Sequence, residues 1–204
     1  MPSREPLKLV RVFIRGYEIP QQNLGAYGVA ALRQQPTPDS KDRLLMFCRA
    51  FLTSLPPQSS LGGTVPPENQ MVTFWPVDNP EAPPVLHDDC DYLTSHYDLN
   101  GGVTAVSDAS QQGHRLDGRG PFLIGWSPSK LRGRPDEVVL ILDLSLMETQ
   151  DDFSESFRLW QNEIIEKPDL WRNGFTLEGL RVAVKNFSDK YGSRILESLK
   201  FWKL

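Results

Sequence analysis

The residues between His87 and Asp98 form the densest group of side chains that could carry chemistry. Two histidines, His87 and His96, flank Cys90, and carboxylates lie on both sides of that cysteine. Imidazole, carboxylate and thiolate groups are the ligands that zinc and other transition metals accept. One hypothesis is therefore a divalent metal site formed by His87, Asp89, Asp91 and His96. No other cofactor is expected.

The spacing within this group departs from known metal-binding patterns. The chain has no Cys-x-x-Cys and no His-Glu-x-x-His. A calcium-binding loop starting at Asp98 also fails, because its sixth residue is Val103 and its twelfth is Ala109, where glycine and glutamate are required. The alternative to a metal site is a polar loop with ordinary hydrogen bonds.

Cys90 is also a candidate nucleophile. A thiolate at Cys90 paired with His96 or His87 would make a cysteine-dependent hydrolase. The neighbouring carboxylates oppose this interpretation, because they disfavour the charged thiolate. Cys48 lies on an apolar helical stripe, where an inert core thiol is expected. With only these two cysteines, we expect a reducing compartment and a cytoplasmic location.

A compact basic loop, Lys130–Arg134, separates two apolar segments. Lys130, Arg132 and Arg134 could bind a phosphate, a nucleotide or an acidic partner, because guanidinium groups suit anion recognition. Neither a Walker motif nor a dinucleotide-binding fingerprint supports this hypothesis. The alternative is a solvated loop that compensates acidic charge elsewhere in the chain.

The charges of the chain are strongly segregated. Residues 51–114 carry eight Asp or Glu and neither Lys nor Arg, although the net charge of the whole chain is only -4. Their repulsion must be relieved by solvent, by the basic stretches 1–50 and 115–136, by a metal, or by a basic partner. If the compensation is intramolecular, we expect salt bridges from Arg115, Arg119, Arg132 or Arg134 to Asp88, Asp89, Asp91 or Asp98.

Hydrophobic periodicity predicts the strands that must position these groups. The predicted strands are Lys8–Ile19, Met71–Val77, Val103–Val106, Pro121–Trp126 and Glu137–Leu144. Pro76 restricts the second of them to a sheet edge or to a strand end. Residues 100–102 should form a turn before the third. The run Val138–Leu142 should be the most buried strand, because consecutive apolar residues point to both faces of a sheet.

Helices are predicted at six places. They cover 21–35 (weakened by Gly25 and Gly28), Asp39–Leu55 with Asp39 or Ser40 as its cap, one or two turns in Cys90–Asp98, Thr149–Glu166 with Thr149 or Asp151 as its cap, Thr176–Tyr191, and Ser193–Leu204. The chain should form one globular domain over residues 1–204, with a proline-rich excursion at 56–84. We expect an α+β (or mixed α/β) fold: a mixed sheet of four to five strands with the helical C-terminal third packed on one face.

Composition limits the classes of function. The 39% of hydrophobic residues suits a soluble globular domain, and no apolar run reaches the ~18 residues of a membrane span. The N-terminus lacks the apolar stretch of a secretory signal. The acidic net charge argues against general nucleic-acid binding.

The chain carries no intact catalytic motif, and no motif assigns it to a family. The segregated charges, the proline-rich excursion and the aromatic pair Phe201 and Trp202 favour a non-catalytic protein–protein interaction module or a subunit of a larger assembly. A protein partner is therefore expected, and Phe201 and Trp202 should pack on the domain or on that partner. The alternatives are the metal-assisted or cysteine-dependent hydrolase and the anion-binding loop.

Overall fold

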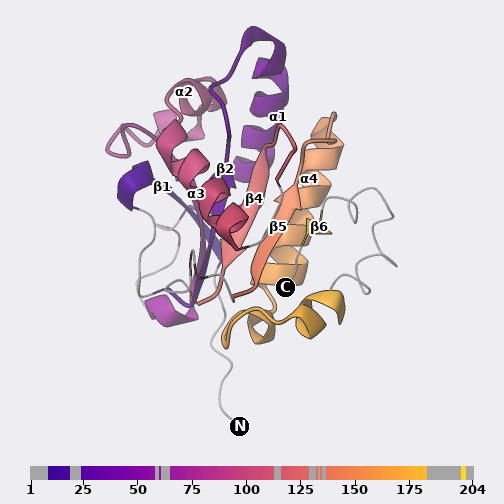
Figure 1. The fold of residues 1–204 in the computed structure, drawn as a ribbon. Helices are drawn as coiled ribbons and strands as arrows, with labels where there is room; N and C mark the ends of the chain where they lie inside the picture. The colour runs from indigo at the N-terminus through magenta and orange to yellow at the C-terminus, as the bar shows by residue number, and fades with distance from the viewer. Residues whose placement is uncertain are drawn as a thin grey trace.

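The fold is built on a mixed β-sheet with helices on both faces (Figure 1). The computed structural model describes residues 9–18, 24–57, 60, 65–112, 116–128, 132, 134, 137–182 and 199–200. The strands are β1 (Leu9–Ile14), β2 (Ala26–Ala31), β3 (Met71–Pro76), β4 (Phe122–Trp126), β5 (Val139–Asp143) and β6 (Leu199–Lys200). Their order in the sheet is β1-β3-β2-β4-β5-β6. The predicted α+β class is confirmed, and the sheet has one strand more than expected.

Strand β2 divides the sheet into a parallel and an antiparallel half. It pairs with β3 in parallel, as β1 does, and with β4 in antiparallel orientation. The pairs β4–β5 and β5–β6 are also antiparallel. The carboxyl ends of β1, β2 and β3 therefore meet at one end of the sheet.

The helices lie in two layers around the sheet (Figure 1). They are α1 (Pro38–Ser54), α2 (Cys90–Ser95), α3 (Leu99–Gln111) and α4 (Gln150–Leu159), which continues as the π-helix η6 (Trp160–Ile165). Buried side chains of α1, α4 and η6 share one hydrophobic core with alternate residues of the strands. Buried side chains of α3 belong to a second core on the opposite face of the sheet.

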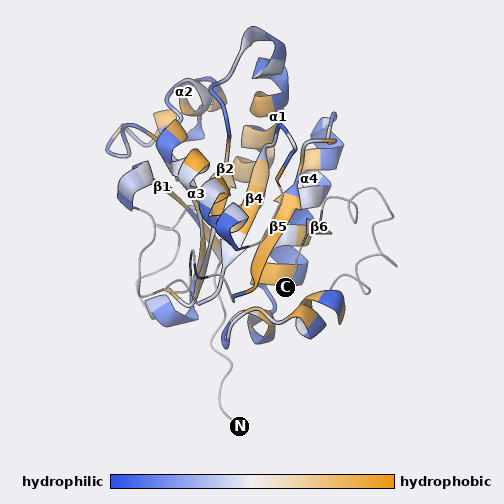
Figure 2. Ribbon diagram, in the orientation of Figure 1, coloured by the Kyte–Doolittle hydropathy of each residue, from blue (hydrophilic) through white to orange (hydrophobic). Residues whose placement is uncertain are grey.

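The apolar strands form the middle of the molecule (Figure 2). In β5, Leu140 and Leu142 belong to the core under α1 and α4, whereas Val139 and Ile141 belong to the core under α3. All four side chains have no exposed surface, and Val138 is 8% exposed. The predicted burial of Val138–Leu142 on both faces is confirmed, but this run is not the most buried strand, because β2, β3 and β4 are buried along their whole length as well.

A pair of glycines makes a hollow in the sheet for one large side chain. Gly28 of β2 and Gly125 of β4 face each other across the ladder. A Cβ atom at Gly28 would lie 2.4 Å from Cζ2 of Trp160, and one at Gly125 would lie 2.8 Å from Cη2. The indole therefore lies directly on the sheet backbone, and its Nε1 donates a hydrogen bond to the Thr73 hydroxyl at 3.0 Å.

The helix predicted over residues 21–35 is wrong. The described part of this segment is the strand β2, in which Ala26 and Ala30 face one core while Tyr27 and Val29 face the other. This strand lies in the sheet interior, between β3 and β4. Its small residues accommodate helices that approach closely, so tertiary packing overrides the alanine preference for helix.

The turn at 100–102 and the strand Val103–Val106 are also wrong, because both belong to α3. The Asp98 carboxylate caps this helix by accepting a hydrogen bond from the Asn100 amide at 3.0 Å. Gly101 and Gly102 let the helix touch other backbone: a Cβ at Gly101 would lie 2.8 Å from Cα of Gly16. The glycines indicate close approach of two segments, not a turn.

The other elements agree with the sequence more closely. Helix α1 matches the predicted Asp39–Leu55, although Thr37 and Ser40 form its capping box and Asp39 lies within its first turn. Thr149 caps α4 as predicted. Pro76 is the last residue of β3, an interior strand, so the strand-end alternative is the correct one.

The C-terminal predictions are tested only in part. Residues 177–182 are helical, as predicted, and Leu199–Lys200 is a strand instead of part of a helix. Phe201 and Trp202 lie outside the described residues. Among the described helices, none combines the length and the apolar character that crossing a membrane requires.

Candidate functional site

The structure separates the side chains of the His87–Asp98 group. Cys90 is the first residue of α2, and its sulfur is bonded to that of Cys48 in α1, with an S–S distance of 2.06 Å. Both cysteines of the chain are used in this disulfide, which joins the two helices. The predicted nucleophile at Cys90 and the inert free thiol at Cys48 are therefore corrected: neither residue has a thiol in this structure. The bond also removes the reason for expecting a reducing compartment.

The two histidines have different surroundings and do not converge. His87 stacks on Phe13 of β1 with ring centroids 4.5 Å apart, and its buried Nε2 has no hydrogen-bond partner among the described residues. His96 stacks on Tyr92 at 4.2 Å, and its Nδ1 lies 3.1 Å from a carboxylate oxygen of Asp78. Each imidazole is therefore positioned by a different aromatic side chain.

The carboxylates proposed as metal ligands have local structural roles. Asp89 is the N-cap of α2, where its Oδ1 accepts hydrogen bonds from the amides of Asp91 and Tyr92. Asp91 forms an ion pair with Lys41 at 2.8 Å, and hydrogen bonding to this ammonium lowers the pKa of the Asp91 carboxyl. Within the described part of the chain, no three His, Cys, Asp or Glu side chains are placed to hold a metal ion.

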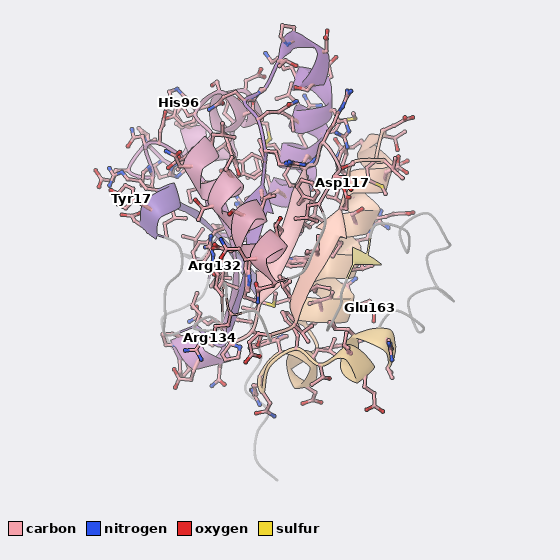
Figure 3. All side chains as sticks on the ribbon, in the orientation of Figure 1. Tyr17, His96, Asp117, Arg132, Arg134 and Glu163 are labelled. Atoms are coloured by element: carbon pink, nitrogen blue, oxygen red, sulfur yellow. A yellow bond between two sulfur atoms is a disulfide. The ribbon has the colours of Figure 1, made fainter. Side chains whose placement is uncertain are left out.

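Of the basic loop, Arg132 lies beside the end of α3 (Figure 3). Arg132 pairs through Nε with the Asp108 carboxylate, and its guanidinium lies 5.0 Å from the ring centroid of Trp126. Its side chain is only 6% exposed, so its donors face protein groups. The exposed Arg134 accepts a hydrogen bond at its carbonyl from Nε2 of Gln112. Lys130 lies outside the described residues.

The negative charge of residues 51–114, the acidic stretch, is compensated mainly by cations from the first 50 residues. Arg11 pairs with Asp88 at 2.7 Å, Lys41 with Asp91 at 2.8 Å, and Arg15 with Glu81 at 3.8 Å. Compensation within the chain is thus present, but the described residues contain none of the predicted pairs. Arg132 does pair with a carboxylate of the acidic stretch, Asp108.

Arg11 is the most deeply buried of the three cations from the first 50 residues. Besides Asp88, it donates hydrogen bonds to the carbonyls of Leu52 at 2.7 Å and Leu55, at the end of α1. Burial lowers the pKa of Arg11, and the Asp88 carboxylate opposes this effect. Arg11 therefore links the edge strand β1 to the end of α1 through hydrogen bonds and to η4 (Leu86–Asp88) through the ion pair.

A surface that the sequence did not reveal lies at the carboxyl end of β1. It comprises Tyr17, Val85 and Val103, which are 76%, 75% and 44% exposed, and we call it the Tyr17 face. Tyr17 belongs to the 3₁₀ turn η1 (Gly16–Glu18), Val85 precedes η4, and Val103 lies on the outer side of α3. Figure 3 shows Tyr17 and His96 on the same side of the molecule.

Two contacts place these segments around the carboxyl end of β1. A Cβ at Gly16 would lie 2.4 Å from the Gly101 nitrogen, so η1 touches the first turn of α3. On the other side, Arg15 forms an ion pair with Glu81, which lies in the segment before η4. Phe13 of β1 stacks on His87 of η4. The sequence offers no local signal for this surface, because its three residues come from three separate segments.

Comparisons with protein-family models, with curated proteins and with solved structures find no match for this chain. The functional interpretation therefore depends on the geometry described above.

Proposed function

We propose that the chain is a non-catalytic protein-interaction module and that it binds a protein partner through the Tyr17 face. One observation carries this proposal. Among the described residues, five large hydrophobic side chains are exposed: Tyr17, Val85, Val103, Leu146 and Val182. Three of the five come from segments around the carboxyl end of β1, where η1 touches α3 and His87 of η4 stacks on Phe13 of β1.

Grouping distinguishes this surface from the ordinary exposure of single apolar side chains. Isolated surface hydrophobics are common and need no explanation, whereas adjacent ones mark interaction sites. Tyrosine is enriched among the residues that contribute most of the binding energy of interfaces. The neighbouring Tyr17 hydroxyl raises the pKa of Arg15, which keeps this cation charged beside the ring.

The catalytic alternatives find less support. The cysteine of the proposed hydrolase is oxidised, and its two histidines stack on different aromatic rings. The anion-binding loop has its central arginine engaged by Asp108 and Trp126. The Tyr17 face, in contrast, presents side chains that face solvent.

Affinity capture with matched variants tests this proposal. The purified chain is immobilised and exposed to a lysate of its source cells, alongside Tyr17→Ala/Val85→Ser and the control Leu146→Ser/Val182→Ser. We expect a protein that is retained in near-stoichiometric amount by the native chain and the control, and at least tenfold less by the face variant. Equal retention by both variants, or no retained protein, would overturn the proposal. Light scattering on the pure chain identifies the case in which the partner is a second copy.

A further inference from the structure

We infer that the partner of the Tyr17 face presents a basic, arginine-rich surface; this inference rests on the proposed function. The segments that carry the apolar side chains of this face also carry many carboxylates. Residues 78–98 contain six acidic side chains and neither Lys nor Arg. They are Asp78, Glu81, Asp88, Asp89, Asp91 and Asp98, and η1 adds Glu18.

The internal ion pairs leave most of this negative charge facing water. The side chains of Glu81, Asp88 and Asp91 are 81%, 69% and 63% exposed although each contacts a cation. Exposed pairs of this kind are weak and are screened by salt. Arg15 is shared between Glu81 and Glu18, both at 3.8 Å, and Glu18 also accepts a hydrogen bond from the Arg15 amide at 3.0 Å. The Glu81 carboxylate in particular remains available to a cation from outside.

Two of the carboxylates are held in fixed positions because they cap helices. Asp98 accepts hydrogen bonds from the amides of Gly16 at 2.7 Å and Asn100 at 3.0 Å, so its carboxylate is held between η1 and α3. Asp89 is held in the same manner at the start of α2. Both groups are fixed before any partner arrives, which lowers the entropy that binding must remove.

Arginine matches this surface better than other cationic or anionic groups. Its planar guanidinium can stack on the exposed Tyr17 ring and hydrogen-bond to carboxylates at the same time. An apolar centre with a charged rim is the usual arrangement of a protein interface. A nucleic acid or an anionic membrane would be repelled by the rim.

Binding of a defined probe tests the charge of the partner. Fluorescence anisotropy compares labelled nona-arginine and nona-glutamate peptides at low ionic strength, and NMR locates the binding site. We expect nona-arginine alone to bind, with chemical-shift changes confined to η1, residues 78–98 and the start of α3. Its affinity should fall at least tenfold between 20 and 200 mM salt, because salt screens the attraction between exposed charges.

Two variants of equal charge provide the control. Glu18→Gln/Glu81→Gln removes two charges beside the Tyr17 face, and the glutamine at position 18 keeps an oxygen that can accept the Arg15 amide. Glu148→Gln/Asp151→Asn removes two charges from the acidic start of α4. We expect about fivefold weaker binding of nona-arginine by the first variant and less than twofold by the second. Equal effects, or shifts centred on α4, would overturn the inference. If nona-arginine does not bind while lysate capture still depends on Tyr17 and Val85, the basic partner is wrong and the interaction module stands.

Discussion

At the scale of single residues, Trp160 packs where a side chain on either of two glycines would lie. Replacing Gly125 by Ala places a methyl group 2.8 Å from the rigid indole, and Gly28→Ala places one at 2.4 Å. Overpacking of this kind costs about 1–3 kcal/mol. Chemical denaturation should therefore give a lower unfolding free energy for both variants.

Making the same substitution in a Trp160→Leu variant separates this overpacking from the intrinsic effect of alanine in a strand. In a Trp160→Leu chain, which is less stable by itself, Gly125→Ala should cost much less than it does beside the indole. The same cost in both backgrounds would contradict packing of Trp160 on the glycine pair.

Tyr97 is a buried hydroxyl with two backbone partners. It donates to the Ala30 carbonyl at 2.9 Å and accepts from the Leu32 amide at 3.0 Å, at the end of β2. Burial raises the pKa of Tyr97 strongly. Tyr97→Phe should lower the unfolding free energy by about 1–3 kcal/mol, because both backbone groups lose their partner. Tyr92→Phe, on a half-buried ring without such bonds among the described residues, should change it little; equal losses would argue against the network.

The pair of Lys41 and Asp91 gives a prediction about pH. The hydrogen bond from Lys41 lowers the pKa of Asp91. The carboxylate therefore favours the folded state above its unfolded-state pKa, and this contribution is lost as the pH falls through the lower folded-state value. NMR titration should find the Asp91 pKa below its ordinary range, and Lys41→Met should raise it. An unchanged value in Lys41→Met would mean that the ion pair does not form in solution.

At the scale of elements, the sequence predicted the strands and helices whose buried faces follow from their own pattern of apolar residues. Strands β1, β3, β4 and β5 and helices α1 and α4 all follow from periodicity and caps. Strand β2 and helix α3 do not, because each contains glycines whose role is to admit another segment. Gly28 admits Trp160, which lies 132 positions along the chain, and Gly101 admits Gly16. A local pattern cannot contain that information.

The disulfide between α1 and α2 was missed for a similar reason. Cys48 and Cys90 are 42 positions apart and their Cα atoms are 5.7 Å apart. Two cysteines at this separation have no pattern that distinguishes pairing from two free thiols. The unrecognised disulfide also led to the hypothesis of a cysteine-dependent hydrolase, because that hypothesis required a free thiol at Cys90.

The covalent link should contribute strongly to stability. For a loop of this length, the restriction of the unfolded chain corresponds to about 4 kcal/mol in the chain-entropy model. Urea denaturation of Cys48→Ala/Cys90→Ala should therefore show a clearly lower midpoint than the native chain. A reductant should lower the midpoint of the native chain and leave that of the variant unchanged. Identical midpoints for the oxidised chain and the variant would show that the bond contributes nothing.

At the scale of the whole molecule, the fold partly compensates the charge segregation of the sequence. The ion pair of Arg11 and Asp88 spans 77 positions, and it places a cation of the first strand beside the acidic stretch. Counting charges by segment correctly predicted that the compensating cations come from outside residues 51–114. It could not identify which cations, because that depends on β1 and β3 being neighbours in the sheet. The exposed Tyr17 face was unpredictable on the same ground, since three separate segments build it.

The disulfide also changes the connectivity of the chain from a line to a ring with two tails. Cys48 and Cys90 close a ring of 42 virtual bonds, with 47 residues before it and 114 after it. A single cut in the ring leaves one covalent molecule until the bond is reduced. When the ends of the unfolded chain are pulled apart, the tension bypasses the ring through the sulfur atoms. About 150 Å of contour length, at ~3.6 Å per residue, is hidden in this state and is released in one step when the disulfide is reduced.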